Sequence, residues 1–114
     1  MNILKKKIYT YKNIQKDSEG YLKNSQHWSI SLAKEIAENE KICLNSDHWE
    51  IIYFMRDFYL KFNVTPSIRM LIKGLQKKRY NKKINSVNLF KLFPKGPAQQ
   101  ASKIAGIPKP VKCL

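Results

Sequence analysis

The sequence predicts an α+β fold with a small N-terminal sheet or hairpin, an array of about five helices, and an extended C-terminal arm. Three observations lead to this prediction. The first twenty residues combine β-prone residues with turn-forming ones. The middle of the chain repeats apolar residues at spacings of three and four, which is typical of amphipathic helices. The last eight residues contain two prolines, which exclude a regular helix there.

Length and composition indicate one globular domain. The chain has 114 residues, of which 43% are hydrophobic and 11% aromatic, enough for a single core. No apolar run approaches the roughly 18 residues that span a bilayer, and the N-terminus lacks the apolar stretch of a signal peptide. Two cysteines do not make a disulfide framework. We therefore expect a protein of the reducing cytosol.

The net charge of +14 allows two interpretations. Lysine and arginine side chains neutralise phosphates, so a nucleic acid is one possible partner. However, 19 of the 22 basic residues are lysines, whereas base readout and bidentate phosphate binding favour arginine. A preference for AT-rich codons would also raise the lysine content. The composition thus favours a solvated basic surface over specific nucleic acid recognition.

The N-terminal β structure is expected at Ile8–Tyr11 (IYTY), followed by a polar turn at Asp17–Gly20. The first helix is expected from about Ser25 to Asn39. Its buried face would consist of apolar residues at helical spacing, namely Trp28, Leu32, Ala33, Ile36 and Ala37.

The second helix is expected over LNSDHWEIIYFMRDFYLKF, with Asn45 as its N-cap. Apolar residues occupy nearly every side of it, so we place it in the middle of the fold. The charged residues Arg56 and Asp57, and Arg69 in the next helix, are interpreted as structural ion pairs.

The third helix is expected over Val64–Lys78, with Thr65 as N-cap and Pro66 at the first helical position. Its buried stripe would be Ile68, Leu71, Ile72 and Leu75.

Two shorter helices are expected after an exposed basic loop at Lys77–Lys83. One begins at Ser86 and ends at Pro94, because proline disfavours helical geometry in the preceding residue. The other begins at Gly96 and ends at Gly106, which supplies a left-handed C-cap. The small residues that would let this last helix approach a neighbour closely are Ala98, Ala101 and Ala105.

The arm spans Ile107–Leu114, and Cys113 is its next-to-last residue. Pro108 and Pro110 keep its start extended and stiff, so eight residues at about 3.3 Å each reach roughly 26 Å. A thiol on such an arm can enter another protein's cleft, and its thiolate is a nucleophile. Cys113 is therefore the candidate reactive residue, the alternative being an incidental tail thiol. Cys43 is interpreted as a packing or surface residue.

No metal or cofactor site is predicted. His27, His48 and Cys43 form no CxxC or HxxxH pair that would hold two ligands on one element. His48 is interpreted as a capping and core residue. The sequence also lacks a glycine-rich phosphate loop and a GxSxG motif.

Three segments resemble the DsrC/TusE sulfur carrier family, and its TusE branch most closely. They are DSEGYL (residues 17–22), HWEIIYFMRDFYLKFNVTPSIRML (48–71) and LFPKGPAQQASKIAGIPKPVKCL (92–114). The resemblance covers most of the chain from residue 17 onward. It is specific, because the glycines, prolines and final cysteine follow one fixed order.

The resemblance implies a single domain over residues 1–114 in which a small N-terminal β-meander packs on the helices and residues 107–114 form a flexible arm. It implies a cytoplasmic sulfurtransferase that needs no cofactor and carries sulfane sulfur as a persulfide on Cys113. The donor would be the TusBCD complex, and the acceptor the tRNA 2-thiouridylase MnmA with its bound tRNA. The product would be 2-thiouridine at the tRNA wobble position.

One residue differs from the pattern in part of the family, and the difference indicates which branch of the family the chain resembles. Members that work with dissimilatory sulfite reductase carry a second arm cysteine eleven residues before the last, and this chain has Ser102 there. A serine cannot join a disulfide, so the resemblance favours a relay through a single cysteine.

Two rival interpretations remain at this stage. The chain would be a nucleic-acid-binding module if its second and third helices acted as a helix-turn-helix and its lysines held phosphates. It would be an accessory docking protein if the tail only anchored it to another enzyme.

Overall fold

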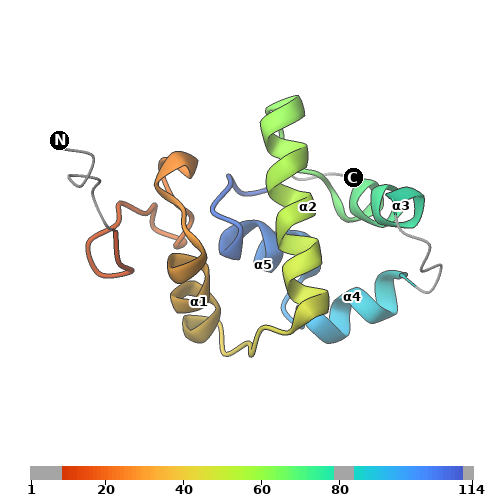
Figure 1. Ribbon diagram of the computed structural model, residues 1–114, viewed down its shortest axis with the longest axis horizontal. Coiled ribbons are helices and arrows are strands. Elements are labelled where there is room, and N and C mark those ends of the chain that lie inside the picture. The colour runs from red at the N-terminus through yellow and green to blue at the C-terminus, as the bar shows by residue number, and fades with distance from the viewer. Residues whose placement is uncertain (1–8, 79–83, 112–114) are drawn as a thin grey trace, which may run out of the picture.

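Five α-helices and a short 3-10 helix make up the described part of the chain. The structure is a computed structural model that describes residues 9–78 and 84–111. Its elements are the 3-10 helix Ser25–His27 and the helices α1 (Ile30–Asn39), α2 (Ser46–Phe62), α3 (Ile68–Lys78), α4 (Ser86–Leu92) and α5 (Pro97–Ile104) (Figure 1). None of the helices in these residues combines the length and apolar character that spanning a membrane requires.

The predicted α+β class is wrong, because residues 9–78 and 84–111 contain neither a β-strand nor the expected N-terminal β-meander. The described N-terminal residues form turns and one isolated antiparallel bridge, between Lys16 and Leu22. The turn predicted at Asp17–Gly20 does form. The Asp17 carboxylate accepts hydrogen bonds from the amides of Glu19 (2.8 Å) and Tyr21 (3.0 Å).

The backbone groups of the expected strand form hydrogen bonds within a local turn and with side chains, and not with a neighbouring strand. The carbonyl of Thr10 accepts from the amides of Asn13 (3.1 Å) and Ile14 (2.9 Å). The amide of Thr10 donates to the Asn13 side chain, and the amide of Tyr11 donates to Glu35 in α1. β-propensity depends on a partner strand against which the side chains pack. Residues 9–78 and 84–111 contain no strand that could pair with residues 9–11, and Ile8 lies outside the described residues.

The first helix begins at Ile30, five residues after the predicted start at Ser25. The Ser29 side chain accepts a hydrogen bond from the amide of Leu32 (3.0 Å) and so caps α1. Residues 25–27 form a separate 3-10 turn, and Trp28 between the two helices is extended (φ −70°, ψ 148°). This break turns Trp28 out of the helical face on which it was expected.

The third helix also begins later than predicted, at Ile68 instead of Pro66. The Ser67 side chain accepts from the amide three residues further on (3.3 Å), which is the geometry of an N-cap. The other predicted starts are confirmed: Asn45 caps α2, and Gly96 precedes α5 with a proline at its first position. The predicted basic loop lies outside the described residues from position 79 to 83.

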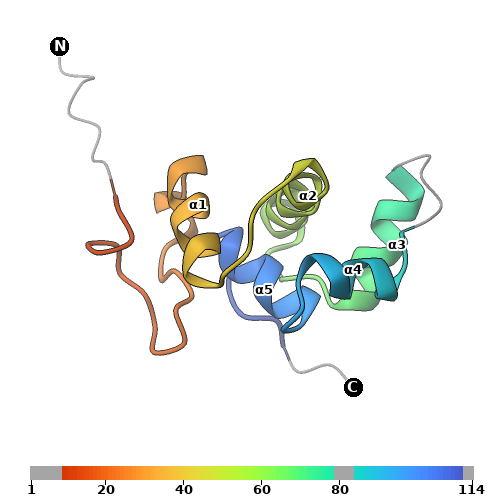
Figure 2. The same cartoon turned by 90° about the horizontal axis from the view of Figure 1, so that it is seen from below.

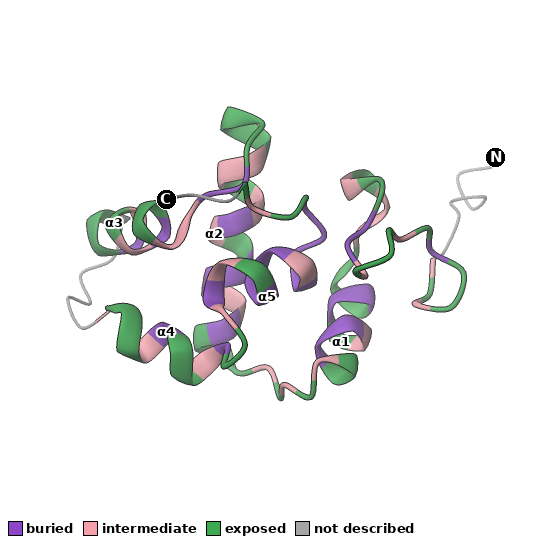
Figure 3. Ribbon diagram, turned by 180° about the vertical axis from the view of Figure 1, so that it is seen from behind, coloured by how far each residue is buried: buried purple, intermediate pink, exposed green. Residues whose placement is uncertain are grey.

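Helix α5 is the centre of the array, since it packs against each of the other four α-helices. Figures 1 and 2 show it between α1 on one side and α3 and α4 on the other, with α2 crossing it. Figure 3 shows how much of α5 is buried. Ala101 and Ala105 are fully buried, which agrees with the prediction that small residues let this helix approach its neighbours, whereas Ala98 is only half-buried.

Helix α2 is central only over its first half, so the prediction that it occupies the middle of the fold is only partly correct. Leu60 and Phe62 in its last turn are 68% and 58% exposed, and this end of α2 projects beyond the other helices (Figure 1). The burial predicted for the two neighbouring helices is confirmed for Leu32, Ala33, Ile36 and Ala37 in α1 and for Leu71 and Leu75 in α3. Ile68 and Ile72, also predicted to be buried in α3, are only half-buried.

A polar cluster ties the C-cap of α1 to α5. The carboxylate of Glu40 accepts from the Gln100 amide (2.9 Å) and from the ammonium of Lys103 (3.2 Å). Partial burial by itself would raise the pKa of Glu40, but the hydrogen bonds from Gln100 and Lys103 outweigh it, so the pKa lies below its usual value. The ionised carboxylate therefore stabilises the packing of α1 on α5.

Glu40→Gln should remove an acid-sensitive part of the stability. Because the folded-state pKa of Glu40 is lowered, its contribution is present above the unfolded-state pKa of about 4.3 and is lost as the pH falls through the folded-state value. Between about pH 5 and pH 3, the free energy of unfolding of the unmodified chain should fall by on the order of 1 kcal/mol more than that of the variant. Urea denaturation measures both. Parallel pH profiles would contradict this.

Candidate functional site

The last turn of α5 is the base from which the C-terminal arm leaves. The C-cap is Ala105, and Gly106 follows it with φ +71°. The amide of Gly106 donates to the carbonyl of Lys103 (3.2 Å), and the amide of Ile107 donates to the carbonyl of Ser102 (3.1 Å). These two bonds form a Schellman motif, in which the left-handed position favours glycine. The prediction that a left-handed Gly106 ends the helix is confirmed, with Gly106 in the position after the C-cap.

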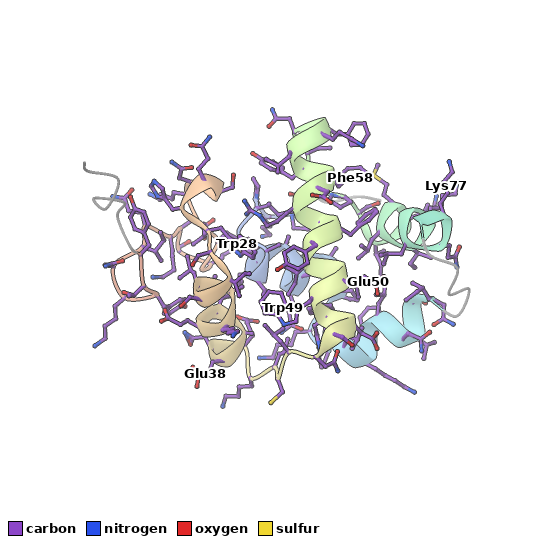
Figure 4. The ribbon with its side chains drawn as sticks, viewed as in Figure 1. Trp28, Glu38, Trp49, Glu50, Phe58 and Lys77 are labelled. Atoms are coloured by element: carbon purple, nitrogen blue, oxygen red, sulfur yellow. The ribbon has the colours of Figure 1, made fainter. Side chains whose placement is uncertain are left out.

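Two side chains from distant parts of the chain bind the next two carbonyls of this turn. Trp28 Nε1 donates to the carbonyl of Ile104 (2.8 Å), and Arg56 Nη1 donates to the carbonyl of Ala105 (2.9 Å). The Arg56 guanidinium also lies over the Trp28 ring, 4.2 Å from its centroid. Figure 4 shows Trp28 between α1 and α2, beside α5. The carbonyls of residues 102–105, which a helix end leaves without intrahelical partners, are thus all bonded.

Arg56 is a structural residue, but it binds backbone carbonyls instead of the carboxylate that the ion-pair prediction expected. Besides the carbonyl of Ala105, it donates from Nη2 to the carbonyl of Ser25 (3.3 Å). Burial lowers the pKa of Arg56, and the neighbouring Asp57 charge opposes this. Guanidinium pKa values start so high that the group stays charged at neutral pH. Its charge lies at the negative end of the α5 dipole, where a cation is favourable.

The first residues of the arm are anchored to the body. Ile107 is 1% exposed and belongs to the core. The buried hydroxyl of Thr65 donates to the carbonyl of Pro108 (2.7 Å), and Lys109 forms an exposed ion pair with Glu19 (3.0 Å). We expected the arm to be flexible from residue 107 onward, but its residues 107–109 contact the body. Cys113, the predicted reactive residue, lies outside the described residues.

A groove of about 840 Å³ borders the described end of the arm. Its walls are the start of α3 at Ser67 and Ile68, Phe90 of α4, the first turn of α5, and arm residues 109–111. Val111 is 74% exposed. The arm thus leaves the body beside α3 and α4.

The residues considered for a metal site have other roles. His48 is buried, accepts at Nδ1 from the amide of Asn45 (3.1 Å) and donates from Nε2 to the carbonyl of Leu92 (2.8 Å). This confirms it as a capping and core residue. His27 stacks on a tyrosine ring, and Cys43 is exposed. Within residues 9–78 and 84–111, no three histidine, cysteine or acidic side chains gather in a group that could hold a metal ion.

Ser102, the residue that the resemblance compared with a second arm cysteine, lies inside α5 and is fully buried. Its hydroxyl donates to the carbonyl of Gln99 (3.0 Å), and the hydroxyl of Tyr21 donates to the same carbonyl (3.2 Å). In this chain the position is therefore part of the packed central helix.

The sequence did not indicate which residues hold the base of the arm. Trp28 was assigned to a helical face, Arg56 to an ion pair and Thr65 to a helix cap. Their actual partners lie 76, 49 and 43 positions away along the chain. No local pattern encodes contacts at such separations. The nearest signal was Gly106, which marked the helix end to which two of these side chains bind.

Comparison with known proteins places the chain in a family. The family model for DsrC-like proteins matches residues 9–114. The chain belongs to the DsrC family. Sulfurtransferase TusE of Buchnera aphidicola subsp. Acyrthosiphon pisum is 66% identical over 114 residues, covering 100% of both chains. Sulfurtransferase TusE of Escherichia coli (strain K12) is 58% identical over 107 residues, covering 94% of this chain and 98% of that one.

A solved structure agrees with this assignment. The NMR structure of Allochromatium vinosum DsrC matches with a TM-score of 0.82 at 40% identity, covering 89% of this chain and 90% of that one. The resemblance to the DsrC/TusE family is thereby confirmed, and the chain is a sulfurtransferase. This classification implies a relay role with partner proteins.

Gly106→Ala should destabilise the base of the arm. The added Cβ would meet Trp28 Cδ1 at 2.4 Å on a backbone with positive φ, so we expect a loss of at least about 2 kcal/mol in the free energy of unfolding. Gly20→Ala is a matched control, since its φ is also positive (+92°) but its Cβ would meet only the Lys103 side chain at 3.7 Å. Urea denaturation should show the larger loss for Gly106→Ala; an equal loss would mean that the Trp28 contact is unimportant.

Thr65→Val should weaken the anchor of the arm. The substitution keeps the shape of the buried side chain but removes the donor to the carbonyl of Pro108, which should cost about 1–2 kcal/mol of unfolding free energy. Thr65→Ser keeps the hydroxyl and should retain more of the stability despite losing a methyl group. If the valine variant were the more stable of the two, the hydrogen bond would not be the anchor.

Proposed function

We propose that Cys113 is the sulfur-carrying residue of this sulfurtransferase, and that the chain relays sulfane sulfur to tRNA thiolation. The observation that carries the proposal is the 66% identity to a sulfurtransferase over the full chain, including its C-terminal end. The anchored base of the arm supports it, since a relay needs a fixed body and a reaching tip. From Pro108, five residues at about 3.3 Å each would bring Cys113 roughly 16 Å outward.

The transfer consists of two thiol–persulfide exchanges. The Cys113 thiolate attacks the terminal sulfur of a donor persulfide; a new S–S bond forms on Cys113, the donor's S–S bond breaks, and the donor leaves as a thiolate. The acceptor's thiolate then attacks the outer sulfur on Cys113 and releases Cys113 as a thiolate. Each step exchanges one S–S bond for another, so no external oxidant or cofactor is required.

The donor in this proposal is the TusBCD complex, and the acceptor is the 2-thiouridylase MnmA with its bound tRNA. All would meet in the cytoplasm, and the product is 2-thiouridine at the tRNA wobble position. An unperturbed thiol has a pKa of about 8.5 and is only a few per cent ionised at neutral pH. The partner's site therefore supplies the activation, while this chain supplies reach and docking.

The rival functions are not favoured. A stand-alone nucleic-acid-binding module or a docking protein with an inert tail would not explain why the match to a sulfurtransferase extends over the whole chain, including its C-terminal end. Single-cysteine relay also fits Ser102, whose hydroxyl cannot form a disulfide and is already bonded within α5.

Cys113→Ser should abolish sulfur loading and tRNA thiolation. After incubation with a persulfide donor, mass spectrometry should show a gain of about one sulfur atom on the C-terminal peptide, which a reductant removes. The variant should show no gain, and 2-thiouridine formation in a reconstituted relay should fall at least about 100-fold, because no other group on the arm is a comparable nucleophile.

Cys43→Ser is the matched control for this experiment. Cys43 is exposed but lies between α1 and α2, away from the arm, so the variant should load and transfer sulfur as the unmodified chain does. Loading on Cys43 with Cys113 unloaded, or full thiolation by Cys113→Ser, would refute the assignment.

A further inference from the structure

The net positive charge of the chain lies almost entirely in its second half. Residues 58–114 contain 13 of the 22 basic residues and none of the eight acidic ones. Codon bias toward lysine would enrich both halves and would not remove acidic residues from one of them. The asymmetry therefore requires another explanation.

In the fold, this half includes α3, α4, α5 and the arm, whereas α1 and α2 carry acidic side chains as far as Asp57. Figure 4 shows Glu38 pointing outward from α1, and Lys77 pointing outward from α3 at the far end of the long axis. Glu50, near the start of α2, is an acidic residue that Figure 4 shows on the side of α2 where α3 and α4 lie. The sequences of α3 and α4 themselves hold no acidic residue.

One face of α3 is a row of cations. Arg69, Lys73 and Lys77 recur every four residues, are all exposed, and lie opposite the buried residues Leu71 and Leu75. At 1.5 Å per residue the row is roughly 12 Å long. Like charges four residues apart repel each other on a helix surface, and an anionic partner bound along this face would relieve that repulsion.

The row lies on the helix beside which the arm leaves the body. The start of α3 and residues 109–111 form walls of the same groove, and Lys91 and Lys95 near its other walls are exposed. A partner bound along α3 would thus be held close to the arm. Under the proposed function, the acceptor brings a polyanion to this place, namely its bound tRNA.

We infer that the exposed face of α3, formed by Arg69, Lys73 and Lys77, binds backbone phosphates of the tRNA held by the acceptor 2-thiouridylase. This inference rests on the proposed function. Lysines are depleted in protein–protein interfaces but neutralise phosphates without reading sequence, and a carrier that serves several tRNAs requires contacts of this sequence-independent kind. RNA is therefore favoured over an acidic protein surface.

The test compares two triple variants with the same loss of charge. Arg69→Gln/Lys73→Gln/Lys77→Gln removes the row on α3. Lys12→Gln/Lys23→Gln/Lys34→Gln removes three exposed lysines from the first half of the chain, which holds all the acidic residues. Binding of each full-length chain is measured by fluorescence anisotropy to the 2-thiouridylase alone and to the same enzyme loaded with an unmodified tRNA transcript, over a range of salt concentrations.

The α3 variant should bind the enzyme–tRNA complex at least about tenfold more weakly than the unmodified chain, and the slope of log affinity against log salt should decrease by about two to three. The control should lose less than about threefold. An equal loss in both variants, or no loss in the α3 variant, would overturn the inference. The same loss on the enzyme without tRNA would assign α3 to an acidic protein surface and would also overturn it.

Sulfur loading separates this inference from the proposed function. Both triple variants should take up sulfur on Cys113 from a donor persulfide as the unmodified chain does, because loading involves no RNA. If Cys113 of the unmodified chain takes up no sulfur, the proposed function fails whatever the RNA measurements show. If loading is normal and tRNA binding is insensitive to α3, only the inference fails.

Discussion

The hydrogen bonding of the last turn of α5 determines where the arm begins. A helix end leaves its last carbonyls without intrahelical partners, and in most helices water or the following residues satisfy them. Here the indole of Trp28 and the guanidinium of Arg56 bind two of these carbonyls, and the Schellman motif at Gly106 binds the other two. These donors come from three separate parts of the chain, so the arm begins at a point fixed by the whole fold.

In this arrangement, the residues that stabilise the fold are different from the residue proposed to react. The central helix is packed against every other α-helix, and the chain stays anchored through Pro108. The reactive thiol proposed at Cys113 requires the opposite environment, because a persulfide that must reach two different partners cannot be held in a core. Pro110 lies between the anchored residues and Cys113 and suits such a change of environment, since proline favours an extended backbone and its nitrogen needs no hydrogen-bond partner from the body.

The sequence predicted those features that depend on local patterns. The caps at Asn45 and Gly106, the buried stripes of α1 and α3, and the small residues of α5 follow from spacing and backbone preference, and the structure contains them. The strand predicted at Ile8–Tyr11 is absent from residues 9–11, the part that the structure describes, because β-propensity acts through packing against a partner strand and residues 9–78 and 84–111 contain none. The base of the arm could not be predicted, since Trp28, Arg56 and Thr65 bind residues more than 40 positions away.

The charge asymmetry and the anchored arm have a common consequence for rate. An unactivated thiol reacts slowly, so a relay gains most from long residence of the tip near the partner's site. Docking by the body turns the attack into an intramolecular event whose effective concentration depends on the length and stiffness of the tether. A short tether that leaves the body beside a cationic helix face would keep this concentration high at an RNA-bearing partner, while long-range attraction would raise the rate of encounter. The body would then contribute to catalysis without touching the sulfur atom.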